Sequence, residues 1–280
     1  MTLKTLVCIL FLLFSPLVFG APIQDEAIHP LKSNGTTAPA FQAKENTSEL
    51  SSLPASITRY MATRQSEKAG SYEVEEPYGK SLCALPGFKC IRVGPHDTWY
   101  QRWHNEHQRE IVMRLNRTNV ALKYRHWLLV PDRMSHLNYM QLSPFPEHIK
   151  SSGHKLLLVD LRVFAFAAYN AEGNLVYWGP ATGGQKWCSD TKEDCRTAVG
   201  RYKIYRIQGE NCKSSKYPFD TKGGAPMPYC MHYYKGFAIH GSTLSGFNNR
   251  SRGCVRVFYS DAKWLNKNFV KLGTRVIVKR

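Results

Sequence analysis

Two residues in the C-terminal third of the chain have the types and setting that thiol chemistry requires. His240 ends a short apolar run, and Cys254 follows Gly253 in a segment of turn-forming residues. A free cysteine is mostly protonated near neutral pH, so a nucleophilic cysteine needs a base such as His240, and Arg252 and Arg256 would stabilise the thiolate. The amides of Gly253 and Cys254 could bind a developing oxyanion, because glycine lets a substrate approach the backbone closely. The pattern favours a nucleophile, and a buried structural cysteine beside a core histidine is the alternative.

The remaining cysteines set Cys254 apart. The chain has 8 cysteines, of which Cys8 lies in an apolar N-terminal run that we expect to be removed. The others group by proximity into predicted disulfides, namely Cys83 with Cys90, Cys188 with Cys195, and Cys212 with Cys230. Other connectivities stay open, because spacing alone does not fix pairing. This grouping predicts one free thiol, Cys254.

Metal and phosphate sites are weaker interpretations. His104, His107 and His232 suggest a metal site, but no complete ligand set occurs at a known spacing, so we predict no metal. Gly183-Gly184 and Gly223-Gly224 are interpreted as turns, because neither lies between a strand and a helix in a phosphate-loop pattern.

Many short strands must position the cysteine and the histidine. Predicted strands cover 156–159, 163–169, 175–178, 201–207, 229–234, 237–240 and 275–278. One convincing helix, Lys263–Phe269, is predicted with Ser260 or Asp261 as its N-cap. The pattern predicts a mainly β domain over residues 150–280.

An upstream segment, residues 83–131, is predicted to be a small βααβ unit. Its strands are expected at 91–93 and 127–131, and its second helix at 110–115. The first helix is expected to start after Asp97 or Thr98 and to place three side chains on one face: Trp99, Trp103 and His107.

The N-terminal eighty residues predict export. Lys4, an apolar run to Phe19 and the small residue Gly20 are typical of a secretory signal peptide at 1–20, and an uncleaved anchor is the alternative. Residues 21–80 are polar and lack apolar periodicity, which predicts a flexible linker. We therefore expect a periplasmic protein with no retained transmembrane segment.

The charge is concentrated in the part that is expected to fold. The formal net charge is +17, with −2 in residues 21–80 and +18 in residues 81–280. Such a basic surface predicts an anionic partner. Export argues against nucleic acid, and we predict no nucleic-acid partner.

The segment around the cysteine resembles the L,D-transpeptidase catalytic domain of the YkuD type. The similarity lies in Ile239-His240-Gly241-Ser242 and in Ser251-Arg252-Gly253-Cys254-Val255-Arg256. It extends from 155 to 279 and includes Thr182-Gly183-Gly184 and Met227-Pro228-Tyr229. The resemblance implies a YkuD-like β-sandwich with one C-terminal-region helix. Arg252 departs from the family pattern, in which this position is usually histidine.

What the resemblance implies is peptidoglycan L,D-transpeptidation. Cys254 would attack the carbonyl between the third stem residue and D-alanine, giving a thioester and then a 3→3 cross-link. His240, oriented by a carbonyl near Gly241 or Ser242, would be base and then acid, and Ser251 would shape the turn that presents Gly253. Residues expected to contact substrate are Arg256, Arg252, Gly241, Ser242 and Tyr229. No cofactor is implied.

Other acceptors and functions stay open at the level of sequence. Water as acceptor would make the protein an L,D-carboxypeptidase or a cross-link hydrolase, and a lipoprotein lysine is a further acceptor. An inactive peptidoglycan-binding protein is the alternative from another class. Residues 83–131 resemble a divergent LysM module, which implies glycan binding, in Val93–Thr98, Leu115–Asn119 and Leu128–Pro131. His96 and His126 depart from that family's glycines.

Overall fold

The computed structural model describes residues 78–218 and 220–280. The predicted signal peptide, nearly all of the predicted linker, and Cys8 lie outside the described residues. Within the described part, no helix is both long and apolar enough to cross a membrane.

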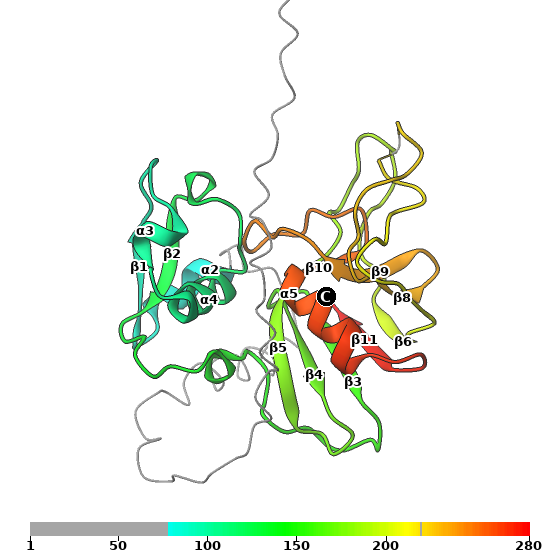
Figure 1. Cartoon of the computed structure of the whole chain (residues 1–280), viewed down its shortest axis with the longest axis horizontal. Coiled ribbons are helices and arrows are strands. Elements are labelled where there is room, and N and C mark those ends of the chain that lie inside the picture. The colour runs from blue at the N-terminus through cyan, green and yellow to red at the C-terminus, as the bar shows by residue number, and fades with distance from the viewer. Residues whose placement is uncertain (1–77, 219) are drawn as a thin grey trace, which may run out of the picture. The chain divides into compact units, whose positions relative to one another are not determined.

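A curled, mixed sheet of nine strands forms the C-terminal part of the molecule (Figure 1). The strand order is β6-β11-β3-β4-β5-β10-β9-β8-β7. The strands are β3 (Leu156–Asp160), β4 (Ala165–Tyr169), β5 (Leu175–Thr182), β6 (Gly200–Lys203), β7 (Arg206–Ile207), β8 (Met231–Tyr234), β9 (Phe237–Gly241), β10 (Val255–Val257) and β11 (Arg275–Lys279). Only Ile204 and Tyr205 separate the edge strands β6 and β7, so the sheet must curl to bring its edges together. The prediction of a mainly β domain is confirmed.

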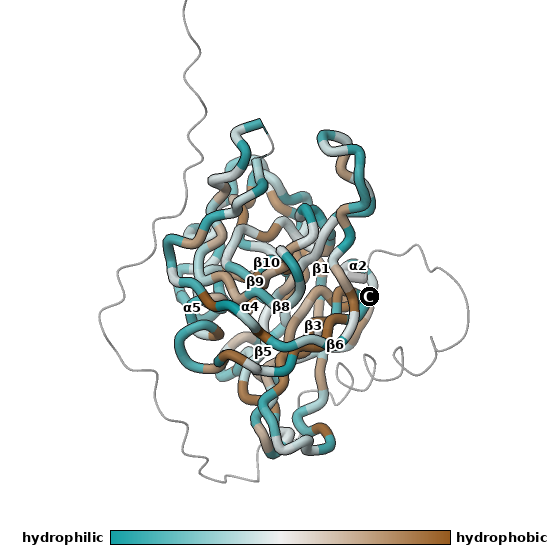
Figure 2. Tube along the Cα trace, turned by 90° about the vertical axis from the view of Figure 1, so that its right-hand side faces the viewer, coloured by the Kyte–Doolittle hydropathy of each residue, from teal (hydrophilic) through white to brown (hydrophobic). Residues whose placement is uncertain are grey.

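The concave side of this sheet holds a hydrophobic core. Its fully buried members include Leu157, Phe166, Ile239, Val255 and Val276, which come from five different strands. In Figure 2 the apolar residues gather along the strands around β3, whereas the loops are largely polar. Burial of these side chains is the main favourable term that holds the strands together.

The helix that packs on this core starts earlier than predicted. Helix α5 spans Tyr259–Trp264 and continues into a wider turn at Leu265–Phe269. The expected N-cap at Ser260 or Asp261 is wrong, because both residues lie inside α5 and no side chain caps it. Asp261 is fully buried, and its carboxylate binds Arg114 instead of capping backbone amides.

The upstream unit has the predicted order of strand, helix, helix and strand. Strands β1 (Phe88–Arg92) and β2 (Trp127–Pro131) pair antiparallel and flank helices α3 (Trp99–Arg102) and α4 (Glu106–Leu115). A short helix, α2 (Tyr78–Ser81), precedes them. The two helices do not form one continuous face, because Asn105 caps α4 and places His107 in the second helix.

The upstream unit and the sheet share a second hydrophobic core. Ile111, Leu115 and Leu129 of the upstream unit pack with Ala167 and Trp178 of the sheet, and all five are almost completely buried. Residues 83–131 therefore do not bury their apolar surface alone. They fold against the back of strands β4 and β5.

A buried ion pair crosses the same contact. The Nη2 atom of Arg114 in α4 donates to Oδ1 of Asp261 in α5 at 2.7 Å, and the two side chains are 1% and 0% exposed. Tyr177 accepts from Arg114 at 2.9 Å and donates to Asp261 at 2.7 Å. The remaining Arg114 donors reach Glu110 and the Trp178 carbonyl, so the buried charge is fully hydrogen-bonded.

Candidate active site

A parallel strand pair brings the predicted cysteine and histidine together. Strand β9 pairs with β10 in parallel, with Ile239 opposite Val255 and His240 opposite Arg256. Cys254 directly precedes β10, and its side chain packs against a cluster that includes Ala238 of β9. A crossover connects parallel neighbours, and here it is the segment between Gly241 and Cys254.

The Cys254 thiol is the free cysteine of the described residues. It is half-buried against Cys212, Met227 and Cys230. Burial raises the pKa of Cys254, and the Ala238 amide and the Arg256 charge only partly oppose that effect. The resting form near neutral pH is therefore the thiol, which needs a base to become a nucleophile.

His240 has the properties of that base. Its ring is 5% exposed, and Nδ1 lies 3.0 Å from the carbonyl oxygen of Gly241. Because a carbonyl only accepts, Nδ1 carries the proton and Nε2 keeps its lone pair. Burial is the main cause that lowers the pKa of His240 to about 4; the Arg256 charge acts in the same direction, and the Gly241 hydrogen bond opposes it. The imidazole is neutral at pH 7 and can accept a proton.

A tight turn before the cysteine is built by Ser251 and Gly253. The hydroxyl of Ser251 donates to the Cys254 carbonyl at 2.6 Å and accepts from the Gly253 amide at 3.1 Å. Gly253 has φ +116°, and a Cβ there would overlap the Phe237 ring. A residue with a side chain would be strained at this position. The Gly253 amide is thus engaged by Ser251.

Gly183 and Gly184, which follow β5, pack and hydrogen-bond against the turn that contains Ser251 and Gly253. Ser251 donates its amide to the Gly183 carbonyl at 3.0 Å and accepts from the Gln185 amide at 2.9 Å. A Cβ at Gly184 would collide with the backbone of Cys195 and Gly253. Gly183 also donates to Asn249 Oδ1 at 2.7 Å. The interpretation of Gly183-Gly184 as a turn is wrong, because Gly184 forms a parallel β-bridge with Ser251 and the pair runs alongside the segment before Cys254.

The two predicted arginines have different surroundings. Arg252 is exposed and forms an ion pair with Asp190, with its Nε 3.0 Å from the carboxylate. Arg256 is half-buried in β10, and its Nε is buried without a hydrogen-bond partner in the described part of the chain. Burial lowers the pKa of Arg256, although the Cys254 thiolate would raise it. Arg256 is a cation at the site without a carboxylate partner in the described residues.

The other expected substrate contacts lie deeper. Tyr229 is 3% exposed in the sheet core, and its hydroxyl donates to Glu210 at 3.0 Å. The Gly241 amide donates to the Pro228 carbonyl at 2.8 Å, and the Ser242 amide donates to Val257 at 2.9 Å. These contacts fix the end of β9 that carries His240.

His232, considered above only as part of an incomplete metal site, is a second buried histidine on the neighbouring strand. His232 of β8 is opposite Ala238 of β9 in register and is 4% exposed. Its Nε2 lies 2.7 Å from Nη2 of Arg206, so His232 is the acceptor and stays neutral. Burial, with a smaller contribution from the Arg206 charge, lowers the pKa of His232 to about 4. Among the described residues no group of three His, Cys, Asp or Glu side chains is arranged to hold a metal.

Sequence reasoning missed how the crossover between His240 and Cys254 is held. The Asn119 side chain accepts from the Leu244 amide at 2.8 Å, and the Asn119 amide donates to the Leu244 carbonyl at 3.1 Å. The Gly246 amide donates to Arg117 at 3.0 Å, and the Phe247 ring stacks on Trp127. The upstream unit thus binds the segment that links His240 to Cys254.

Among the described residues there are three disulfides, in the pairs expected from proximity. Cys212–Cys230 lies in the cluster that Cys254 packs against, and Cys188–Cys195 lies beside Gly184. Cys83–Cys90 links the start of the upstream unit to β1. Both disulfides of the sheet domain brace segments next to the thiol.

Residues 154–278 match the YkuD family, which is described as the L,D-transpeptidase catalytic domain. This region is a YkuD-type L,D-transpeptidase catalytic domain. The curled, mainly β sheet around Cys254 is the fold of that domain. The match does not include residues 83–131, so the resemblance of the upstream unit to LysM stays a prediction.

Solved L,D-transpeptidases are among the similar structures. One is from Xylanimonas cellulosilytica (23% identity, TM-score 0.41, 49% of this chain and 66% of that chain). Others are from Mycobacterium tuberculosis (16%, 0.37, 75% and 88%) and Stackebrandtia nassauensis (14%, 0.40, 81% and 91%). The chain spans less than two thirds of the Xylanimonas chain. Because the TM-scores are all low, the domain is identified by the family match alone. No curated protein matches the sequence significantly.

Proposed function

We propose that this protein is a peptidoglycan L,D-transpeptidase that acts through a Cys254 thioester. The observation that carries the proposal is a free Cys254 thiol directly before β10, which pairs in parallel with the strand of the buried, neutral His240, within a YkuD catalytic domain. Acyl transfer from a peptide stem requires a nucleophile and a base in this protonation state.

In the first half of the reaction His240 Nε2 takes the thiol proton as sulfur attacks the carbonyl between the third stem residue and D-alanine. The C–N bond then breaks, and His240 returns the proton to the departing D-alanine amine. The product is a thioester on Cys254. In the second half an acceptor amine attacks the thioester, gives up a proton through His240, and releases the thiol.

The oxyanion of each tetrahedral intermediate needs a donor in the turn. The Gly253 amide already donates to Ser251, so we assign this role to the Cys254 amide. Ser251 then acts by fixing the turn from both sides of Gly253.

Arg256 is proposed to bind a carboxylate of the stem peptide. It is half-buried next to His240 in the sheet, and no acidic side chain of the described residues pairs with it. A guanidinium binds a carboxylate with two parallel hydrogen bonds, which gives orientation as well as energy.

The acceptor is proposed to be the side-chain amine of a diamino acid in a second stem, which gives a 3→3 cross-link. The same acyl-enzyme would serve a lipoprotein lysine or water. The signal-peptide pattern, the disulfides and the cell-wall substrate all support a periplasmic location.

The test is to incubate the mature protein with purified disaccharide-tetrapeptides and to identify products by mass spectrometry. A dimer that has lost one D-alanine, absent with Cys254→Ala, supports transpeptidation. If tripeptide is the only product, the protein hydrolyses the acyl-enzyme and is an L,D-carboxypeptidase instead of a transpeptidase. No product, with a substrate that a related enzyme converts, would contradict the proposal and favour an inactive binding protein.

A further inference from the structure

A basic pocket lies where the upstream unit meets the crossover between His240 and Cys254. It has a volume of about 520 Å³. Its lining residues are Val120, Lys123, Tyr124, Arg125, His126, Ser245, Asn248 and Arg250. This lining includes three permanent cations and no acidic residue. This volume lies in the range of small-molecule binding sites.

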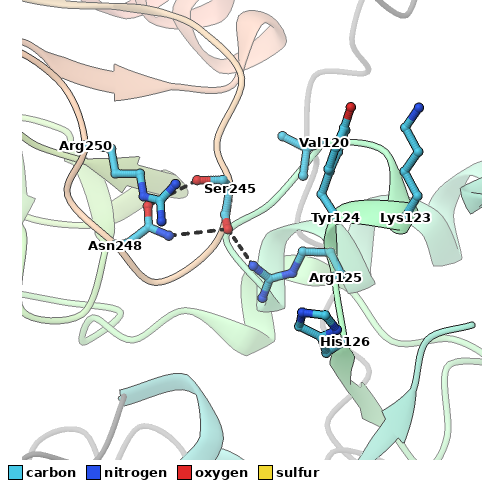
Figure 3. A pocket seen from close by; sticks show the side chains of 8 residues that line it. All are labelled: Val120, Lys123, Tyr124, Arg125, His126, Ser245, Asn248 and Arg250. Atoms are coloured by element: carbon cyan, nitrogen blue, oxygen red, sulfur yellow. Dashed lines mark hydrogen bonds between the residues drawn. The ribbon is translucent and has the colours of Figure 1, made fainter. Parts of the chain in front are cut away.

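The cations of the pocket are not neutralised by the protein. None of Lys123, Arg125 and Arg250 takes part in the ion pairs of the described residues. Arg125 is half-buried, donates from Nη1 to the Ser245 carbonyl at 2.5 Å, and has a buried Nε without a partner. Figure 3 shows Arg125 reaching toward Ser245, with Asn248 and Arg250 on the far side of the pocket. A buried polar atom without a partner is costly unless a ligand or water satisfies it.

The walls of the pocket belong to the two segments that hold each other near the active site. One wall is residues 120–126, which follow Asn119, and the other is residues 245–250, which end directly before Ser251. A ligand in the pocket would therefore contact the crossover that carries Cys254, without using the thiol itself.

We propose that this pocket binds carboxylates of a peptidoglycan stem peptide at a site separate from the one at Cys254. The inference rests on the proposed function, because it takes the stem peptide as the anion that the enzyme meets. Carboxylates suit the planar donors of Arg125 and Arg250, and Lys123 adds a third charge at the rim.

Binding is to be measured in the Cys254→Ala variant, which cannot form a thioester, with a fluorescently labelled disaccharide-tetrapeptide. The double change Lys123→Gln and Arg250→Gln removes two exposed pocket cations, and we expect affinity to fall roughly fivefold at low salt. Methyl esterification of the peptide carboxylates should weaken binding to the parent protein by a similar factor. Hydrogen exchange in 120–126 and 245–250 should slow when the peptide binds.

The matched control is Arg133→Gln with Lys150→Gln, which removes the same charge from two exposed positions outside the pocket. Equal loss of affinity in both double variants would overturn the pocket and leave only a general effect of net charge. Unchanged exchange in both pocket segments would overturn it as well.

Product formation by the unaltered protein is followed in parallel. If the unaltered protein forms cross-linked product but the pocket variants bind the peptide normally, this inference is wrong and the proposed function stands. If the pocket variants weaken peptide binding but the unaltered protein forms no product, the pocket binds the peptide and the proposed transpeptidase function is wrong.

Discussion

At the scale of single residues, the proposed roles of Cys254 and His240 predict how activity responds to pH. Burial raises the pKa of Cys254 and lowers the pKa of His240 to about 4. The histidine must be neutral to accept the thiol proton, so it stays competent until the pH falls to about 4. We expect the acid limb of kcat/KM against pH near 4. A limb near the ordinary histidine pKa would contradict this assignment.

Arg256 provides a second prediction at this scale. If it binds a substrate carboxylate, Arg256→Gln should lower kcat/KM by about 10- to 100-fold, mainly through KM, because a hydrogen bond to a charged group is lost. Steady-state kinetics on the tetrapeptide and on its methyl ester give the measurement. The variant should have the same kcat/KM for the tetrapeptide and for its methyl ester, whereas the unaltered enzyme should have a higher kcat/KM for the tetrapeptide with free carboxylates. Arg252→Gln is the control, because Arg252 pairs with Asp190.

Residue types and order along the chain were sufficient to single out Cys254 and His240 as the candidate pair. Cys254 could be separated from the other cysteines by spacing, and the segment around it resembles a known signature. His232 and Arg206 could not be recognised in this way. Their contact depends on the antiparallel register of β7 and β8, and no local pattern in either segment specifies that pairing.

At the scale of elements, the crossover from β9 to β10 depends on one side chain of the upstream unit. Asn119 accepts from the amide of Leu244, a residue that is 1% exposed. Asn119→Ala would leave that buried donor unsatisfied, at a cost of about 1–3 kcal/mol. We expect faster hydrogen exchange in 242–250 and a lower kcat.

The matched control is Asn138→Ala, which also removes an acceptor for a backbone amide, at an exposed turn. It should leave exchange in 242–250 unchanged. If both variants behave alike, the crossover does not depend on Asn119.

Strands with long apolar runs could be predicted from the sequence, whereas short elements close to the candidate site could not. Most strands of the sheet were found within a few residues of their observed ends. Strand β10 was missed because it has only 3 residues, too few to show a period. The start of α5 was misplaced because Asp261 resembles a cap in sequence, and its partner Arg114 is 147 residues away.

At the scale of the whole molecule, the pair of Arg114 and Asp261 joins the upstream unit to the catalytic domain. Arg114→Met leaves a buried carboxylate unpaired, and we expect a loss of about 3–5 kcal/mol in the free energy of unfolding. Adding Asp261→Leu should recover part of that loss. Urea denaturation of the parent, both single variants and the double variant measures the coupling. Additive losses would mean that the two charges do not stabilise each other.

The shared core also limits what the sequence could show about organisation. Residues 83–131 have the pattern of a small unit that folds alone, and their element order was predicted. Their apolar residues nevertheless pack on Ala167 and Trp178. Hydrophobic pattern identifies which residues are buried but not which partner buries them.

The position of strand β11 has a consequence for how the chain reaches this state. Residues 275–279 lie between β3 and β6 and bond to both of them. Strands β3 and β6 come earlier in the chain, and both pair with β11. The hydrogen-bonded ladder across this part of the sheet therefore needs the five residues of β11. Such long sequence separation between partners slows folding. The part of the sheet that joins β6 to β3, in the same sheet as β9 and β10, is therefore complete only after this long-range pairing has formed.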